Sequence, residues 1–220
     1  PRGGDRERRV DGGRHRVAFL AYAWGLKQRG AATDHDRHVI PCGHRDEEID
    51  LASLEADGAT ARADGADSVV ALLHWGYEYE YYPDPHFMVL ARRIVAAGVD
   101  LVVGSGPHVV QPAEICHVNR PEQVPGIGAC SIRTDDGEPR TAAVLYSLGN
   151  FGTIMATVPC QAGLVVSVTL DPDVTGLGWT AVATVDDPPW LRPLDDLLDD
   201  GELAAESTRL DGHLGPDWRL

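Results

Sequence analysis

The sequence predicts an α/β fold, because a complete strand–helix–strand unit can be recognised between Ser68 and Val103. Two short apolar runs, Ser68–Leu73 and Leu101–Val103, are typical of strands that are buried on both faces. The residues between them have helical spacing and clear end signals. A right-handed crossover would then place the two strands side by side in a parallel sheet.

The elements before this unit are less regular. Residues Arg16–Ala23 predict a strand, 24–44 a polar loop, and Glu47–Ala63 a helix that is imperfect near Gly58. The segment Asp34–His38 (DHDRH) contains an Asp-x-His pattern, but it lies in the polar loop, and we interpret it as solvated.

The helix of the unit is defined at both ends. Asp84 can cap it, Pro85 fits its first position, and Gly98 can end it. Its buried stripe consists of apolar residues at helical spacing: Phe87, Leu90, Ala91 and Ile94.

Further strands follow the unit. They are expected at Pro112–Val118, Ala142–Leu148, Leu164–Leu170 and Trp179–Val185, and a long loop is expected at Asn119–Arg140. An antiparallel set of the later strands fits a second sheet. We therefore expect a polar, disordered segment at 1–15, one domain at 16–187, and an acidic tail at 188–220 with a short helix near Leu194–Glu206.

Composition limits the class of function. The chain has 220 residues, 43% of them hydrophobic and 24% charged, as in soluble globular domains. Its formal net charge of −15 disfavours binding to nucleic acid or to an anionic membrane. The sequence contains no membrane-spanning apolar run and no export signal, so the cellular location stays open.

The four cysteines form no CxxC pair, so a structural zinc site is not indicated. Cys116 fits a small buried side chain, and a bridge to Cys130 is an open alternative.

Two histidines follow the two strands of the unit. His74 ends the first run, and His108 lies in the loop after the second. Parallel strands end at the same edge of a sheet, where open α/β sheets place their binding sites. The sequence therefore predicts that His74 and His108 share a site.

Three motifs, HWGYEY from His74, GPHVVQ from Gly106 and YSLGNF from Tyr146, resemble the poly-gamma-glutamate capsule biosynthesis (CapA-type) family, a branch of the calcineurin-like metallophosphatases. The resemblance runs from about Arg16 to Leu170. It implies a metallophosphatase-like sandwich of two mixed sheets flanked by helices. It also implies two divalent metal ions of the Mn, Fe or Zn type, metal-assisted hydrolysis of phosphoesters, and a role at the cell surface with polyglutamate and capsule-synthesis proteins as partners.

The resemblance also suggests site residues. His74 and His108 match metal-ligating and catalytic histidines of the superfamily, and Glu78 could be a third ligand or could orient His74. Asn150, Trp75 and Gln111 are candidates for substrate contact. Two of them have a structural alternative, since Trp75 could cover the core and Asn150 could tie two loops together.

This sequence departs from the family pattern in two ways. The earlier acidic and Asn-His motifs have no match. In addition, members commonly carry another histidine at the position of either Ser105 or Gly106, and neither residue here is a histidine. A divalent metal site needs three or more protein ligands. The sequence therefore leaves open a metal-dependent hydrolase, a non-catalytic scaffold or binding module, and a fragment that lacks the N-terminal half of its domain.

Overall fold

The computed structural model describes residues 7–11, 15–23, 51–120, 128–135, 137–153, 155–185 and 190–215. The expected polar loop at 24–44, with the DHDRH segment, lies outside these residues. None of the helices described is long and apolar enough to cross a membrane.

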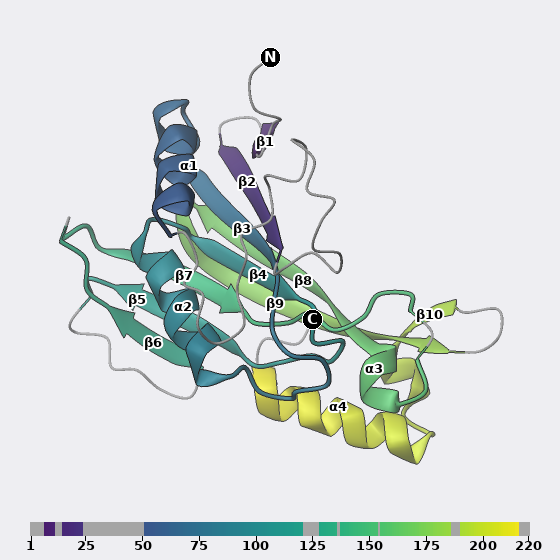
Figure 1. The fold of residues 1–220 in the computed structure, drawn as a ribbon. Coiled ribbons are helices and arrows are strands. Elements are labelled where there is room, and N and C mark those ends of the chain that lie inside the picture. The colour runs from purple at the N-terminus through teal and green to yellow at the C-terminus, as the bar shows by residue number, and fades with distance from the viewer. Residues whose placement is uncertain are drawn as a thin grey trace, which may run out of the picture.

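A mixed seven-stranded sheet forms the centre of the fold (Figure 1). Its order is β1 (Glu7–Asp11), β2 (Arg16–Ala23), β3 (Ser68–His74), β4 (Leu101–Ser105), β7 (Arg140–Leu145), β5 (Ala113–Val118) and β6 (Ala129–Ile132). The strands β2, β3, β4 and β7 are parallel to one another, so their carboxyl ends share one edge.

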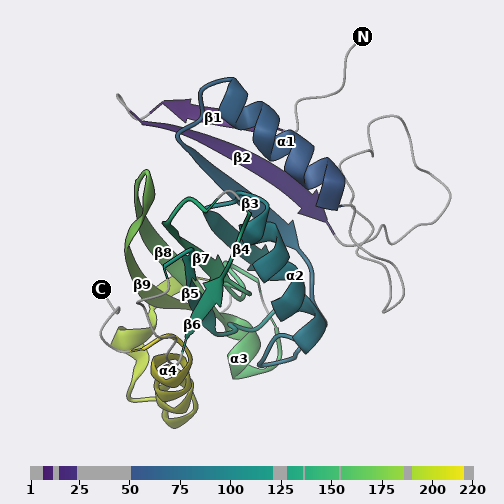
Figure 2. The same cartoon turned by 90° about the vertical axis from the view of Figure 1, so that its left-hand side faces the viewer.

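Two helices, α1 (Leu51–Ala63) and α2 (Pro85–Ala96), cover one face of this sheet (Figure 2). The Asp84 side chain caps α2 by accepting from the backbone N–H of His86 at 2.9 Å, and Pro85 occupies the first turn. The predicted stripe, Phe87, Leu90, Ala91 and Ile94, is buried against β3 and β4. The strand–helix–strand unit is therefore confirmed.

An antiparallel three-stranded sheet packs on the other face. Its order is β10 (Trp190–Pro193), β9 (Asp173–Val185) and β8 (Ala162–Asp171). Trp179 of β9, 1% exposed, lies in a core shared with Leu101 and Leu145 of the first sheet. The short α3 (Val158–Gln161), the 3-10 helix η1 (Leu194–Leu197) and α4 (Gly201–Leu214) complete the chain. The predicted α/β sandwich of two helix-flanked sheets is confirmed, although only the larger sheet is mixed.

Several elements differ from the sequence expectation. Strand β1 lies in the segment 1–15, and β6 lies in the expected loop 119–140, where a four-residue run gives no periodic signal. The tail 188–220 contains β10, η1 and α4. Because Leu203, Leu210 and Leu214 of α4 are buried in the second core, this helix packs as part of the same domain.

Candidate functional site

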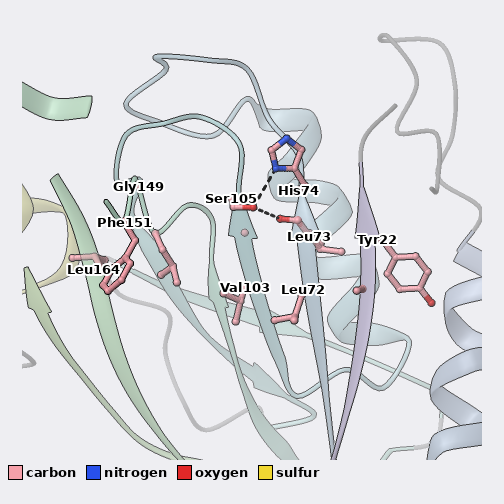
Figure 3. A pocket seen from close by; sticks show the side chains of 12 residues that line it. Tyr22, Leu72, Leu73, His74, Val103, Ser105, Gly149, Phe151 and Leu164 are labelled. Atoms are coloured by element: carbon pink, nitrogen blue, oxygen red, sulfur yellow. Dashed lines mark hydrogen bonds between the residues drawn. The ribbon is translucent and has the colours of Figure 1, made fainter. Parts of the chain in front are cut away.

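The carboxyl ends of β2, β3 and β4 border a cavity of about 580 Å³ (Figure 3). Most of its lining is apolar, and His74 and Ser105 supply polar side chains at its rim. The residues that line it are Ala21, Tyr22, Leu72, Leu73, His74, Val103, Gly104, Ser105, Leu148, Gly149, Phe151 and Leu164.

His74 is the last residue of β3, and its side chain is exposed. Its Nδ1 lies 3.3 Å from Oγ of Ser105, the residue beside it on β4. The Ser105 hydroxyl donates its single proton to the Leu73 carbonyl at 3.3 Å, as Figure 3 shows, so it accepts from His74 Nδ1–H. Nε2 of His74 has no hydrogen-bond partner among the described residues.

His108 has a positive φ of 63°, a conformation in which histidine is enriched among non-glycine residues. Its Nδ1 lies 2.9 Å from Oδ1 of Asn150. The Asn150 amide is oriented by its Nδ2, which donates to the Cys160 carbonyl at 2.7 Å. Oδ1 therefore accepts from His108 Nδ1–H, and Nε2 has no hydrogen-bond partner in the part of the chain that the structure describes.

The loops after β3 and β4 run side by side, as the strand order predicts. The backbone N–H of Trp75 donates to Ser105, and that of Tyr79 donates to Pro107, each at 2.8 Å. Gly106, at φ +120°, allows this approach, because a Cβ there would lie 2.4 Å from the Trp75 carbonyl oxygen. The Tyr79 ring also stacks on His108, with centroids 6.2 Å apart.

Trp75 does not line the cavity, and its substrate contact stays a prediction. The side chain is 2% exposed, stacks on Tyr146, and donates from Nε1 to the Tyr146 carbonyl at 2.9 Å. Burial, reinforced by the nearby Glu114 carboxylate, raises the pKa of the Tyr146 phenol, whose O–H donates to Glu114 at 2.8 Å. Trp75 is thus a core residue beneath the site.

Gln111 also has a structural position. It is 3% exposed, its Nε2 donates to the Glu80 carbonyl at 2.8 Å, and its backbone N–H donates to Ser147. Gln111 therefore ties three loops together, and its expected role in substrate binding stays a prediction.

The predicted metal-ligand set of His74, His108 and Glu78 does not assemble. Among the described residues, a group of three close metal-binding side chains occurs at Glu114, Cys116 and Cys130, and not at these positions. Cys116 and Cys130 form a disulfide, so their sulfurs are bonded to each other. Glu78 is exposed. The role of Glu78 as a third ligand therefore stays a prediction.

Sequence reasoning missed several residues that act on the site. In the sequence, Ser105 stands out only as a departure from the family pattern. No local pattern in the sequence indicates a role for Arg209 of α4. Arg209 donates to the Val110 carbonyl at 3.0 Å, across 99 positions of sequence. Such a partner can be found only from the fold.

The chain is similar in sequence to known proteins. A family model described as bacterial capsule synthesis protein PGA_cap matches residues 5–154. The capsule biosynthesis protein CapA of Bacillus anthracis is 46% identical over 86 residues, which is 39% of this chain and 15% of that protein. The PGA biosynthesis protein CapA of Bacillus subtilis (strain 168) is 46% identical over 50 residues, 23% of this chain and 13% of that protein. The matches therefore span a small share of these relatives' lengths.

Among solved structures, the sulfate thiohydrolase SoxB of Thermus thermophilus in complex with glycerol aligns with a TM-score of 0.44 and 16% identity. The alignment covers 94% of this chain and 29% of that chain.

Proposed function

Because this chain belongs to the bacterial capsule synthesis protein PGA_cap family, we propose that it acts in the synthesis of a capsule of the poly-γ-glutamate type, as the names of its relatives suggest. The proposed site is the edge where β3 and β4 end. The observation that carries the proposal is the pair His74 and His108, each with Nδ1 held by a neighbour and with no hydrogen-bond partner for Nε2 among the described residues.

The free nitrogens define what this site can bind. A neutral imidazole with a lone pair on Nε2 accepts a hydrogen bond from an N–H or O–H group, or ligates a divalent metal. The backbone of a γ-linked glutamate chain offers amide N–H donors. The exposed rings of Tyr79 and Phe151 offer apolar surface for its methylene groups.

A resident metal centre does not fit the described residues. Two imidazoles supply two ligands, and a divalent site needs three or more. This chain supplies no third imidazole there, because Ser105 and Gly106 occupy the two positions at one of which family members commonly carry a histidine. We therefore assign the described part of the chain a binding role, in which His74 and His108 hold a segment of polymer as a module of the synthesis machinery.

Metal-dependent phosphoester hydrolysis is the second candidate. It is supported by the donor set, because ligating histidines commonly donate their other N–H to a neighbouring acceptor, as His74 and His108 do. This activity requires ligands in addition to the residues that the structure describes.

Calorimetric titration of the whole chain separates these two functions. We expect a γ-linked glutamate oligomer to bind, and His74→Ala and His108→Ala each to weaken that binding several-fold. His86→Ala, which removes an exposed histidine of α2, is the matched control and should leave binding unchanged.

The same samples are titrated with Mn²⁺ and Zn²⁺. Under the binding proposal, neither metal binds stoichiometrically, and no metal-dependent phosphoesterase activity appears. Oligomer binding that survives both histidine substitutions would reject the proposal. Stoichiometric metal binding that either substitution abolishes would instead support the phosphoesterase.

The disulfide between Cys116 and Cys130 is relevant to the cellular compartment in which the protein acts. Both side chains are buried, at 0% and 4% exposure, and neighbouring strands hold them as direct partners. Disulfides persist mainly in oxidising compartments. This supports a role at the cell surface.

A further inference from the structure

We propose that α4, which lies beyond the residues matched by the family model, positions both histidine-bearing loops through the guanidinium of Arg209. The inference rests on the proposed role of His74 and His108, and it assigns a positioning residue to that site. Figure 1 shows α4, in yellow, beside the loop that leads from β3 to α2.

The helix is itself firmly held. Asp200 caps its first turn by accepting from the backbone N–H groups of Glu202 at 2.9 Å and Leu203 at 3.2 Å. On one face, Leu210 is fully buried and Leu214 is 6% exposed in the second core. A helix that is fixed in this way can act as a rigid support for its polar side chains.

The orientation of Arg209 is set by Glu206, one turn earlier. Two hydrogen bonds join them, from Nε to Oε2 at 2.8 Å and from Nη2 to Oε1 at 2.5 Å. Glu206 is only 3% exposed. A bidentate pair with a buried carboxylate fixes the plane of the guanidinium, and leaves Nη1 to point away from Glu206.

Nη1 of Arg209 reaches the loop of His108. It donates to the carbonyl oxygen of Val110 at 3.0 Å, two residues after His108. Val110 also forms an isolated antiparallel bridge with Leu148, two residues before Asn150. This hydrogen bond therefore acts on the two backbone segments that carry His108 and its partner Asn150.

The same guanidinium reaches the loop that follows His74. Its Cζ lies 4.8 Å from the centre of the Tyr81 ring, within the range of a cation–π contact. One turn along α4, the ring of His213 lies 4.8 Å from that of Tyr82. The loop of His74 is thus held against the helix face that holds the loop of His108.

Arg209→Lys is the informative variant, because lysine keeps the charge but lacks the planar fork that pairs with Glu206 while reaching Val110. Side-chain ¹H–¹⁵N spectra of the whole chain report the protonated nitrogen of each imidazole without any ligand. We expect the variant to shift the His108 ring signals and the backbone amides of 77–82 and 106–111. Oligomer binding should weaken several-fold. Arg192→Lys, on exposed β10, is the matched control and should change neither readout.

Tyr81→Leu tests the second contact without touching the ion pair. It should shift the amides of 77–82 and leave the Arg209–Glu206 signals in place. Unchanged His108 signals and unchanged oligomer binding in Arg209→Lys would overturn the inference, even if the melting temperature fell. If His108→Ala leaves binding unchanged while Arg209→Lys moves the His108 signals, the proposed function fails and the positioning role stands.

Discussion

Both candidate site histidines owe their chemistry to a partner that is distant in sequence. His74 is oriented by Ser105, 31 positions away, and His108 by Asn150, 42 positions away. Each partner engages Nδ1, so Nε2 is the atom that each histidine offers to a ligand. Removing a partner should therefore alter the tautomer of the imidazole as well as its position.

The close approach at Gly104 gives a residue-level prediction. A Cβ there would lie 1.9 Å from the Tyr146 carbonyl oxygen and 2.4 Å from Trp75 Nε1, which are hydrogen-bonded to each other. We expect Gly104→Ala to lower the free energy of unfolding by about 1–3 kcal/mol, as overpacking does. Urea denaturation measures this change.

Gly58→Ala is the control for that substitution. Gly58 lies inside α1, and a Cβ there would meet no atom within 4 Å. Alanine should stabilise this helix by about 0.5–1 kcal/mol. Equal effects of the two substitutions would show that the approach at Gly104 is not tight.

The environment of His213 predicts that the free energy of unfolding depends on pH. Burial, and then the charge of Arg209, lower its pKa below the ordinary value of 6.5. Its Nδ1 lies 3.0 Å from Arg209 Nη1, so it accepts from the guanidinium, and protonation there would oppose this contact. It also faces Glu206 and the Val110 backbone, whose charge and hydrogen bond respectively raise the pKa and partly offset the shift, and the Tyr82 ring.

The direction of this pH dependence follows from the protons that the folded and unfolded chains bind. Below pH 6.5 the unfolded chain binds a proton at His213 before the folded chain does, so stability falls as pH falls through the two pKa values. His213→Gln should reduce this loss. Urea midpoints at pH values on either side of 6.5 measure the effect, and identical pH profiles for wild type and variant would contradict it.

At the level of elements, the strand pair β5 and β6 is fastened covalently. Cys116 and Cys130 are direct cross-strand partners, with Cα atoms 4.5 Å apart. Strand β6 has four residues and lies at the edge of the sheet. The disulfide therefore anchors a strand whose own pairing is short.

Loss of this bond should be measurable. We expect the double variant Cys116→Ala/Cys130→Ala to lower the free energy of unfolding by about 2–4 kcal/mol, the typical contribution of a disulfide. Peptide mapping without reduction should recover the two cysteines in one linked pair. Cys160→Ala, at a buried free cysteine, is the control: it keeps the disulfide, so its stability should match that of the wild type and should fall with reductant in the same way. Free thiols at both Cys116 and Cys130 would contradict the prediction.

At the level of the whole molecule, charge opposes the proposed ligand. The chain carries a formal net charge of −15, and poly-γ-glutamate is also an anion. Short-range hydrogen bonds at His74 and His108 must then act against long-range repulsion. Salt screens the repulsion over about 10 Å at 0.1 M ionic strength, while hydrogen-bonded contacts are affected less.

Oligomer binding should therefore strengthen as salt is added. Titrations at low and high NaCl concentration test this, and an oligomer with its carboxylates amidated is the control that should show little salt dependence. Binding that weakens with salt would indicate attraction between opposite charges, and would place the contact on a basic surface instead of this site.

Much of the architecture could be predicted from local pattern. The α2 segment had a cap at Asp84, a proline in its first turn and a regular stripe, and its structure agrees at each point. The shared edge of β3 and β4 followed from strand order alone. In contrast, Gly176 and Gly178 hid the first half of β9, because glycine carries no side chain to reveal a strand period.

The sequence by itself determined the α/β class, the family, and the placement of His74 and His108 at one sheet edge, because these depend on periodicity, end signals and short motifs. Only the tertiary structure decided that Trp75 faces the core, that Cys116 pairs with Cys130, and that Arg209 reaches both loops. The physical reason is that local pattern records whether a side chain is buried, whereas its partner depends on how distant segments pack. The function of the site lies in those partners.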